Sequence, residues 1–256
     1  MIKTYNKEQL DYVREGGKIL AQALSILKDS VKPGISTMEL DKIAEDFIRA
    51  QGAEPAFMGY NGYKHTICAS VNEEAIHGIP RTDKILKEGD IISVDCGVKW
   101  KGFCTDAART IAVGKISDEA HKLIDATEQS FFQAIKGLKA MSKVGDIGTR
   151  IENYIKGNTN FSIIEKFCGH GIGEEVHQEP RIINYVPKVK INLHTDLRKR
   201  LPAGCVIAIE PMINVGTKDV KVGDDGWTVV TGDGKLSAHY ENTVIVLEGC
   251  VEVVTL

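Results

Sequence analysis

Two carboxylates close apolar stretches that share one pattern. Asp95 ends LKEGDIISVD, and Glu210 ends LPAGCVIAIE 115 residues later. In each stretch a turn glycine precedes alternating apolar residues, which is typical of a strand that packs on a core. An ionised carboxylate is almost never buried without a partner, because its desolvation is costly. The repeat therefore predicts two half-domains that direct acids into one shared site, where a metal ion is the usual partner.

A second aspartate, Asp106, follows Asp95 in VDCGVKWKGFCTDAART. If Trp100 and Lys101 form a two-residue hairpin loop, Asp95 lies directly opposite Asp106, with Cβ atoms about 4.5 to 5.5 Å apart. Like charges at that distance destabilise the pair, whereas a divalent cation between them reverses the effect. Two exposed acids near a turn are the alternative, and the apolar neighbours of both aspartates favour the metal site.

Two further residues extend this set of hard donors. Glu241 precedes the last strongly apolar strand, in HYENTVIVLEG, and is expected to point into the fold, although a lone glutamate at a strand start is usually solvated. His170 lies in CGHGIG, where the glycines suit either close approach of the backbone to a ligand or an ordinary turn. Four carboxylates and one imidazole are the donors expected for paired Mn, Fe, Co or Zn ions. The candidate metal ligands are Asp95, Asp106, His170, Glu210 and Glu241.

Amphipathic helices must hold the strands that carry these donors. Capping boxes that begin at Asn6 and Ser36 each precede apolar residues spaced by three and four, which predicts two helices. Further helices are expected over 117–140 and 146–156. Each half of the chain then runs from helices to a glycine-led strand and an acid. This order predicts an α+β fold with pseudo-twofold symmetry.

The composition of the 256 residues excludes several classes of protein. A net charge of −3 gives no global attraction for nucleic acid or anionic membranes. The N-terminus has no apolar signal-peptide region, and no apolar run approaches the length of a membrane span. Six cysteines without a CxxC pair indicate reduced residues of a cytoplasmic protein. The chain has no Walker A, GxGxxG, HExxH or GxSxG motif, which removes the commonest nucleotide-binding, zincin and serine-hydrolase interpretations.

The five donors, in the contexts VDCG, TDAART, GHGIG, IEPM and HYENTV, resemble the type I methionine aminopeptidases of bacteria over essentially all 256 residues. The resemblance implies one catalytic domain with the pita-bread fold, in which two related halves, roughly 1–114 and 115–256, combine antiparallel sheet with covering helices. It also implies two divalent ions (Co, Mn, Fe or Zn) and removal of the N-terminal methionine from nascent proteins whose second residue is small.

The same resemblance gives each donor a role. Asp106 and Glu241 would bridge both ions, and Asp95 would chelate one of them. His170 and Glu210 would complete the other, and Glu210 would also act as the proton shuttle.

The resemblance further implies groups that bind substrate. His77 in IHGIP and His177 in EVHQEP would contact the substrate and the tetrahedral intermediate, the alternative for each being a buried structural histidine. The chain departs from the family at Val176, where an aromatic residue is usual, and at Phe57, where a cysteine is common. An apolar pocket for the methionine side chain would be formed by residues that could otherwise be plain core: Tyr60, Tyr63, Cys68 and Trp227.

Two rival classes are a related Xaa-Pro peptidase and a non-catalytic binding protein on the same fold. Xaa-Pro peptidases usually carry an additional N-terminal domain, for which this chain has no room, and the intact ligand set counts against a non-catalytic protein. Segment 188–200, KVKINLHTDLRKR, carries five basic residues and one acid. It could make a weak, salt-sensitive contact with the ribosome, although a solvated loop is the commoner explanation. No long apolar heptad seam is present, so a monomer is the default expectation.

Overall fold

The computed structural model describes residues 1–187 and 197–256. Both predicted capping boxes are confirmed, since Asn6 and Ser36 each accept a hydrogen bond from the backbone three residues later. The third helix ends earlier than expected because Gly137, with φ of 70°, takes a left-handed conformation that stops it. The helices are α1 (Lys7–Ser30), α2 (Thr37–Ala50), α3 (Asp118–Ile135) and α4 (Val144–Asn158). None of these helices is both long enough and apolar enough to cross a membrane.

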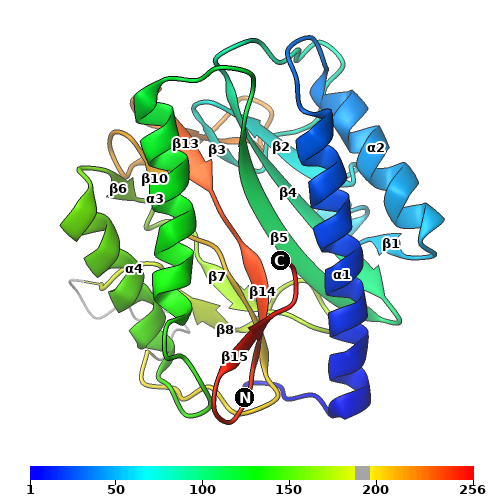
Figure 1. Cartoon of the computed structure of the whole chain (residues 1–256), viewed down its shortest axis with the longest axis vertical. Helices are drawn as coiled ribbons and strands as arrows, with labels where there is room; N and C mark the ends of the chain where they lie inside the picture. The colour runs from blue at the N-terminus through cyan, green and yellow to red at the C-terminus, as the bar shows by residue number, and fades with distance from the viewer. Residues whose placement is uncertain (188–196) are drawn as a thin grey trace.

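An antiparallel sheet forms the core of the first half of the chain. Its long strand β4 (Ile91–Trp100) pairs with β1 (Glu54–Pro55), β2 (Ile67–Val71) and β5 (Phe103–Ala112). Helices α1 and α2 cover this sheet (Figure 1), and Leu20, Leu27 and Leu40 are buried against its apolar residues. A 3₁₀ turn, Tyr60–Gly62, lies between β1 and β2.

A second antiparallel sheet, in the order β15-β14-β9-β7-β8, is formed by the second half. Its strands are β7 (Gly169–Gly171), β8 (Gln178–Ile182), β9 (Val206–Ile209), β14 (Asn242–Val246) and β15 (Val251–Val253). Helices α3 and α4 pack on each other beside it (Figure 1) and share one apolar core with its strands. The α+β class with antiparallel sheets and covering helices is therefore confirmed.

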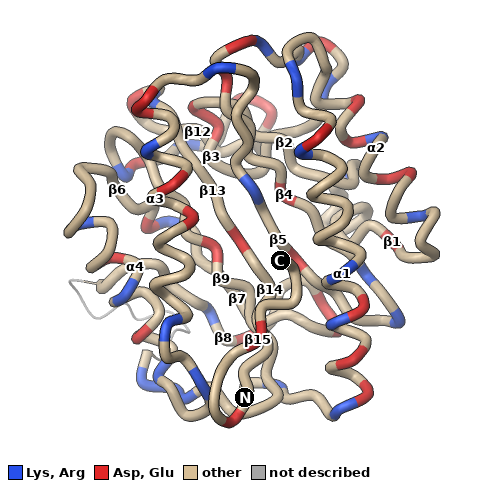
Figure 2. The backbone as a smooth tube through the Cα atoms, viewed as in Figure 1, with Lys and Arg blue, Asp and Glu red and all other residues tan. Residues whose placement is uncertain are grey.

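Two small three-stranded sheets lie beside these larger ones, in the orders β13-β10-β6 and β11-β12-β3. Their strands are β3 (Glu74–Ile76), β6 (Ser162–Ile163), β10 (Met212–Asn214), β11 (Val220–Val222), β12 (Val229–Thr231) and β13 (Ser237–His239). In Figure 2 acidic positions occur on the central strands, away from the charged surfaces of the helices.

The hairpin between β4 and β5 forms, but its loop is one residue further along than expected. Trp100 pairs with Phe103, so the loop residues are Lys101 and Gly102 rather than Trp100 and Lys101. Lys101 and Gly102 have φ of 50° and 85°. Positive φ at both central residues is what a type I′ hairpin turn requires, and a glycine at the second position suits it.

This register changes how the two aspartates face each other. Asp95 lies opposite Ala108, and Asp106 lies opposite Gly97. The prediction that Asp95 lies directly opposite Asp106 is therefore wrong. The two aspartates are diagonal neighbours on one face of the sheet, a separation that side chains can still span.

The two halves meet where β5 runs beside residues 239–243, and we call this contact the central seam. Glu241 N–H donates to the carbonyl oxygen of Ala108 at 3.0 Å, and Asp106 N–H donates to Thr243 Oγ1 at 2.8 Å. One step further along, the backbone N–H of His239 donates to Thr110 Oγ1 at 2.9 Å. The seam thus fixes Asp106 and Glu241 relative to each other although they are far apart in sequence.

The glycines on both sides of His170 make room for neighbouring strands. A Cβ atom on Gly169 would lie 2.3 Å from the carbonyl oxygen of Ala208, and one on Gly171 would lie 2.2 Å from that of Glu179. Both distances are far inside van der Waals contact. Strand packing around β7 therefore requires these glycines.

We predict that Gly171→Ala lowers the free energy of unfolding by roughly 1 to 3 kcal/mol, because the added methyl group forces β7 and its neighbour apart. Gly157→Ala, in α4 with open space around the new Cβ, is the matched control. It should be neutral or stabilising by up to about 1 kcal/mol. Urea unfolding followed by circular dichroism compares the two variants, and equal stabilities would contradict the packing argument.

Candidate metal centre

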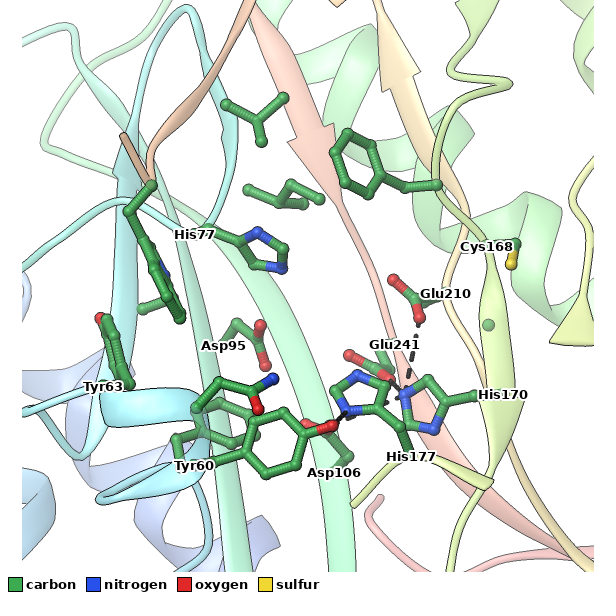
Figure 3. Close-up of a pocket in the computed structure, with 18 of the residues that line it drawn as sticks. Tyr60, Tyr63, His77, Asp95, Asp106, Cys168, His170, His177, Glu210 and Glu241 are labelled. Atoms are coloured by element: carbon green, nitrogen blue, oxygen red, sulfur yellow. Dashed lines mark hydrogen bonds and ion pairs between the residues drawn. The ribbon is translucent and has the colours of Figure 1, made fainter. Parts of the chain in front are cut away.

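A cavity of about 750 Å³ collects all five predicted donors in its lining. Figure 3 shows their side chains converging from both halves of the chain. The donors come from β4 (Asp95), β5 (Asp106), β7 (His170), the end of β9 (Glu210) and the residue before β14 (Glu241). Strands from both sheets therefore supply one site, as the repeat predicted.

His170 faces three of the carboxylates without forming a hydrogen bond to any. Its Nε2 lies 3.9 Å from Asp106 Oδ2, 3.7 Å from Glu210 Oε1 and 3.9 Å from Glu241 Oε1. The other ring nitrogen, Nδ1, is 3.0 Å from the carbonyl oxygen of Gly171. Donation from Nδ1 to that carbonyl leaves the Nε2 lone pair directed at the acids, which is the orientation that a metal-binding imidazole needs.

The carboxylates lack the partners that buried charges require. Asp95 Oδ1, Asp106 Oδ1 and Glu241 Oε1 are buried and accept no hydrogen bond. Burial raises the pKa of Asp95 to about 7, and burial with the nearby charge of Asp95 raises the pKa of Glu210 to about 8. Burial and neighbouring carboxylates also raise the pKa of Asp106 and Glu241 well above the ordinary carboxyl range. A divalent cation would supply the missing partner and favour the ionised acids, so these residues fit a metal site.

The predicted substrate histidines lie on the cavity wall, outside the donor cluster. The His177 ring is centred 4.2 Å from that of His170, and its Nδ1 is 2.9 Å from the hydroxyl oxygen of Tyr60. His77 lies against Phe167 and has φ of 61°. A left-handed conformation is uncommon for such a residue and stores strain, which is frequent at functional sites.

Both wall histidines are biased toward the neutral state. Burial lowers the pKa of His77 to about 4 and also lowers the pKa of His177. Each imidazole therefore offers one donor and one acceptor nitrogen near neutral pH. That combination suits contacts with a peptide group.

All four predicted pocket residues line the cavity, together with Phe57. The rings of Tyr63 and Trp227 are stacked, with centroids 5.2 Å apart, and burial raises the pKa of the Cys68 thiol, which keeps it uncharged. Tyr60 is the most exposed of these residues, at 37%. The wall beside the acids is thus apolar and aromatic.

Val176, singled out from the sequence as a departure, is not among the residues that line the cavity. It is 4% exposed and belongs to a core cluster that includes Tyr5 and Phe103. Phe57, the other departure, does contact the cavity. Any effect of Val176 on pocket shape must therefore be transmitted through the core.

Two residues beside the acids were not among the predicted site residues. Arg109 is half-buried and donates from Nη1 to the carbonyl oxygens of Ala108 and Glu241, at 2.9 and 2.6 Å. His239 places Nε2 3.6 Å from Glu210 Oε2 and 3.6 Å from Glu241 Oε2. The spacing of His239 and Glu241 was the available signal, because residues two apart in an extended strand share a face.

The described residues contain two groups of donors that could each hold a metal ion. One group is Asp106, His170 and Glu241, and the other is Asp95, His239 and Glu241. Glu241 belongs to both. The cluster therefore has the donors for adjacent ions with a shared carboxylate.

Comparison with known proteins identifies similar chains over the whole length. Residues 11–248 match the family described as Metallopeptidase family M24. The methionine aminopeptidase of Clostridium perfringens is 49% identical over 256 residues, which cover 100% of this chain and 99% of that protein. The solved methionine aminopeptidase of Rickettsia prowazekii superposes with a TM-score of 0.93 at 35% identity, with 100% of both chains covered. This likeness confirms the pita-bread fold.

An Xaa-Pro dipeptidase from Bacillus anthracis is also similar, with a TM-score of 0.76. At 22% identity, this likeness shows the shared fold alone. The alignment covers 98% of this chain but 61% of the dipeptidase. The full-length matches to methionine aminopeptidases are thus closer than this one in both sequence and structure.

We predict that the metal-free protein loses stability as pH rises from 7.5 to 8.5. In this window the folded state still binds protons at Asp95 and Glu210, whose pKa values are raised to about 7 and about 8. The same groups are already ionised in the unfolded chain. The folded state therefore binds more protons, so the free energy of unfolding falls as they are lost.

Urea titrations of the metal-free protein at pH 7.5 and 8.5 measure this effect. The lower limit of pH 7.5 is chosen because an unfolded histidine has a pKa of about 6.5, so the buried histidines with lowered pKa are then largely neutral in both states. Glu210→Gln, which cannot ionise at that position, should show a smaller loss than the wild type. Stability that is constant or rises over the window in the metal-free wild type would contradict the raised pKa values.

Proposed function

The chain belongs to metallopeptidase family M24 and, within it, to the methionine aminopeptidases, and we propose on this basis that it removes the N-terminal methionine from nascent proteins in a reaction that depends on divalent metal. The observation that carries the proposal is the convergence of four carboxylates and His170 beside an aromatic wall in one cavity. Membership of family M24 supports the dependence on metal, and the cavity gives a peptide N-terminus access to the donor residues.

Two ions are proposed, held by Asp95, Asp106, His170, Glu210 and Glu241. Glu241 belongs to both donor groups, which supports its role as a bridge. Asp106 lies beside it across the central seam and is proposed as the second bridge. Co, Mn, Fe and Zn all suit a mixed carboxylate and imidazole site. Bound ions would activate a water molecule and polarise the scissile carbonyl group.

Glu210 is proposed to move the proton. In the metal-free site, burial and the nearby charge of Asp95 raise its pKa to about 8, and bound cations would favour the ionised carboxylate, which is the form that accepts a proton. One carboxylate oxygen would accept the proton of the attacking water and then donate it to the leaving nitrogen of the second residue. Asn184 holds the Glu210 backbone by donating from Nδ2 to its carbonyl oxygen at 3.0 Å.

The wall histidines are proposed to orient the substrate. His177 is held by the Tyr60 hydroxyl on one side and by the ring of His170 on the other. His77 approaches from the opposite wall in Figure 3, supported by Phe167 and Trp227. Two neutral imidazoles on opposite walls can contact the peptide group on both sides of the bond that is cleaved.

The apolar wall is proposed as the methionine pocket. Tyr63, Trp227 and Cys68 present two aromatic faces and an uncharged thiol, and Tyr60 lies at the rim. A flexible thioether side chain gains favourable contacts with aromatic rings. Phe57 adds a further aromatic contact to this surface.

Other expectations from the sequence remain proposals: one catalytic domain over 1–256, a monomer, a cytoplasmic location and weak association with the ribosome through segment 188–200. Residues 188–196 of that segment lie outside the described residues. In the described part, Lys199 Nζ is 3.6 Å from Glu179 Oε2, and Arg200 Nη1 donates to the carbonyl oxygen of Met141 at 2.7 Å. These two basic groups are thus engaged within the molecule.

We predict that His170→Ala and His77→Ala fail in different ways. His170→Ala removes a proposed ligand, so elemental analysis after dialysis should show less bound metal than in the wild type. His77→Ala should keep its metal and lower kcat on Met-Ala-Ser by about 10²- to 10⁴-fold, the range typical of a lost group that acts on the transition state. Equal loss of metal in both variants would show that the two roles are wrongly assigned.

We predict strong selectivity for the residue after methionine. Met-Ala-Ser and Met-Gly-Ser should be cleaved with kcat/KM at least about 100-fold above Met-Leu-Ser, because the methionine aminopeptidases act on chains whose second residue is small. The dipeptide Ala-Pro, a substrate for an Xaa-Pro peptidase, serves as the control and should not be cleaved. Uniform kcat/KM over the series, or preferential cleavage of Ala-Pro, would refute the proposed function.

A further inference from the structure

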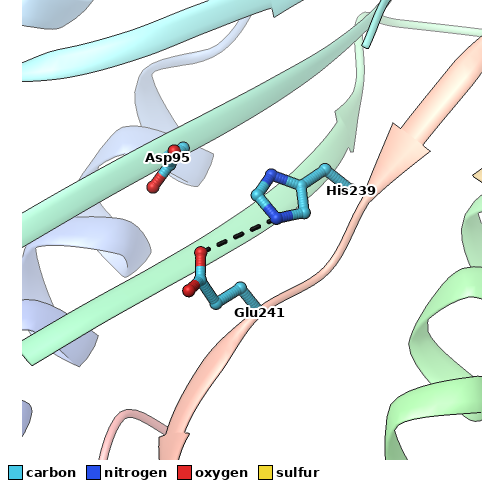
Figure 4. A group of neighbouring side chains, drawn as sticks. All are labelled: Asp95, His239 and Glu241. Atoms are coloured by element: carbon cyan, nitrogen blue, oxygen red, sulfur yellow. Dashed lines mark ion pairs between the residues drawn. The ribbon is translucent and has the colours of Figure 1, made fainter. Parts of the chain in front are cut away.

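We propose that His239 is a metal ligand, which with Asp95 and Glu241 holds the second ion and gives each of the two ions one imidazole. This inference rests on the metal dependence proposed above and extends its ligand set. Figure 4 shows the three side chains near one another, with Asp95 on one strand and with His239 and Glu241 on the segment that runs from β13 into β14. Asp95 comes from β4, His239 from the end of β13, and Glu241 from the residue before β14.

The imidazole of His239 is buried with no partner for either ring nitrogen. The residue is 2% exposed, and neither Nδ1 nor Nε2 forms a hydrogen bond among the described residues. Buried polar groups are almost always paired, because an unpaired one keeps its desolvation cost. An unpaired, buried nitrogen that faces carboxylates is therefore a candidate metal ligand.

The distances suit a shared ion better than a hydrogen bond. His239 Nε2 is 3.6 Å from Glu210 Oε2 and 3.6 Å from Glu241 Oε2, beyond hydrogen-bond distance of either. Ligand atoms that each lie about 2.0 to 2.2 Å from one ion are separated from one another by roughly 3 to 4 Å. The nitrogen thus faces the space between acids instead of donating to one of them.

His170 shows the same arrangement in the other donor group. Its Nε2 is 3.7 to 3.9 Å from three carboxylates, again without a hydrogen bond. The resemblance in sequence assigned His170 as a ligand and left His239 without a role. In both imidazoles Nε2 faces Glu241 without a hydrogen bond, although only His170 has a partner for Nδ1.

His239 is placed to hold an ion and not to contact substrate. It is not among the residues that line the cavity, whereas Asp95, Glu210 and Glu241 are. The seam fixes its backbone, since its N–H donates to Thr110 Oγ1 and Thr110 Oγ1 donates to its carbonyl oxygen, both at 2.9 Å. The imidazole therefore approaches the acids from the side opposite the cavity, where the peptide is proposed to bind.

A second imidazole affects which metals the site accepts. Nitrogen ligands favour Zn, Co and Fe, whereas an all-carboxylate site suits Mn and Mg. With His239 as a ligand, the Asp95 site should prefer Co to Mn. Removal of the imidazole should reduce that preference.

The test is proton NMR of the wild-type protein after the metal-free form has been loaded with two equivalents of Co²⁺. Each imidazole bound through Nε2 keeps an Nδ1 proton, which gives a paramagnetically shifted signal that disappears in D₂O. Two such signals are expected, one each from His170 and His239. A single signal, lost in His170→Ala, would overturn the proposal without affecting the proposed function, which peptide turnover measures separately.

His239→Gln is the variant for a second measurement, because glutamine keeps an N–H donor near the position of Nε2 but no imidazole. Calorimetric titration with Co²⁺ should show a dissociation constant for the second ion raised at least about 10-fold, with a smaller change for Mn²⁺. His121→Ala removes an exposed histidine on α3 and should match the wild type. Wild-type affinity for both ions in His239→Gln would instead make His239 a replaceable hydrogen-bond donor and would overturn the proposal.

Discussion

The repulsion among four carboxylates in one buried site is the interaction around which this molecule is organised. Burial removes the hydration of each acid, and each charge raises the pKa of the neighbouring carboxyl groups. The metal-free cluster therefore favours partly protonated acids. A folded chain can keep such a cluster only if the strands that carry it are fixed by other contacts. Divalent cations then convert the same repulsion into a driving force for binding.

The central seam provides much of that fixation. Backbone groups of Ala108 and Glu241 form hydrogen bonds across it. Thr243 Oγ1 accepts a hydrogen bond from Asp106 N–H and donates one to the Asp106 carbonyl oxygen. The Arg109 guanidinium adds bonds to two carbonyl groups on opposite sides, with its Cζ 4.5 Å from the centre of the Tyr240 ring. The apolar cores under α1 and α2 and under α3 and α4 hold the two sheets on either side of this line.

The cavity contains two groups of residues that differ in how the backbone supports them. The acids lie in or directly beside strands, whereas two of the residues proposed to meet the substrate lie outside any strand. These two residues are His77, in its left-handed conformation, and Tyr60, in a 3₁₀ turn. Such positions can differ between proteins of one fold without changes in the strands that carry the acids, and the fold alone does not fix the function.

The sequence by itself determined the helix starts, the glycine-led strands and the five candidate donors, because each depends on local patterns of capping, alternation and charge. Tertiary structure decided the register. The β4–β5 loop lies one residue further along because Gly102 readily adopts the positive φ that the second turn position requires, and this made Asp95 and Asp106 diagonal rather than opposite. Val176 was likewise placed in the core instead of the cavity lining. The spacing of His239 and Glu241 was a local signal that they share a face, but only the tertiary structure placed His239 beside Glu210 and in one donor group with Asp95.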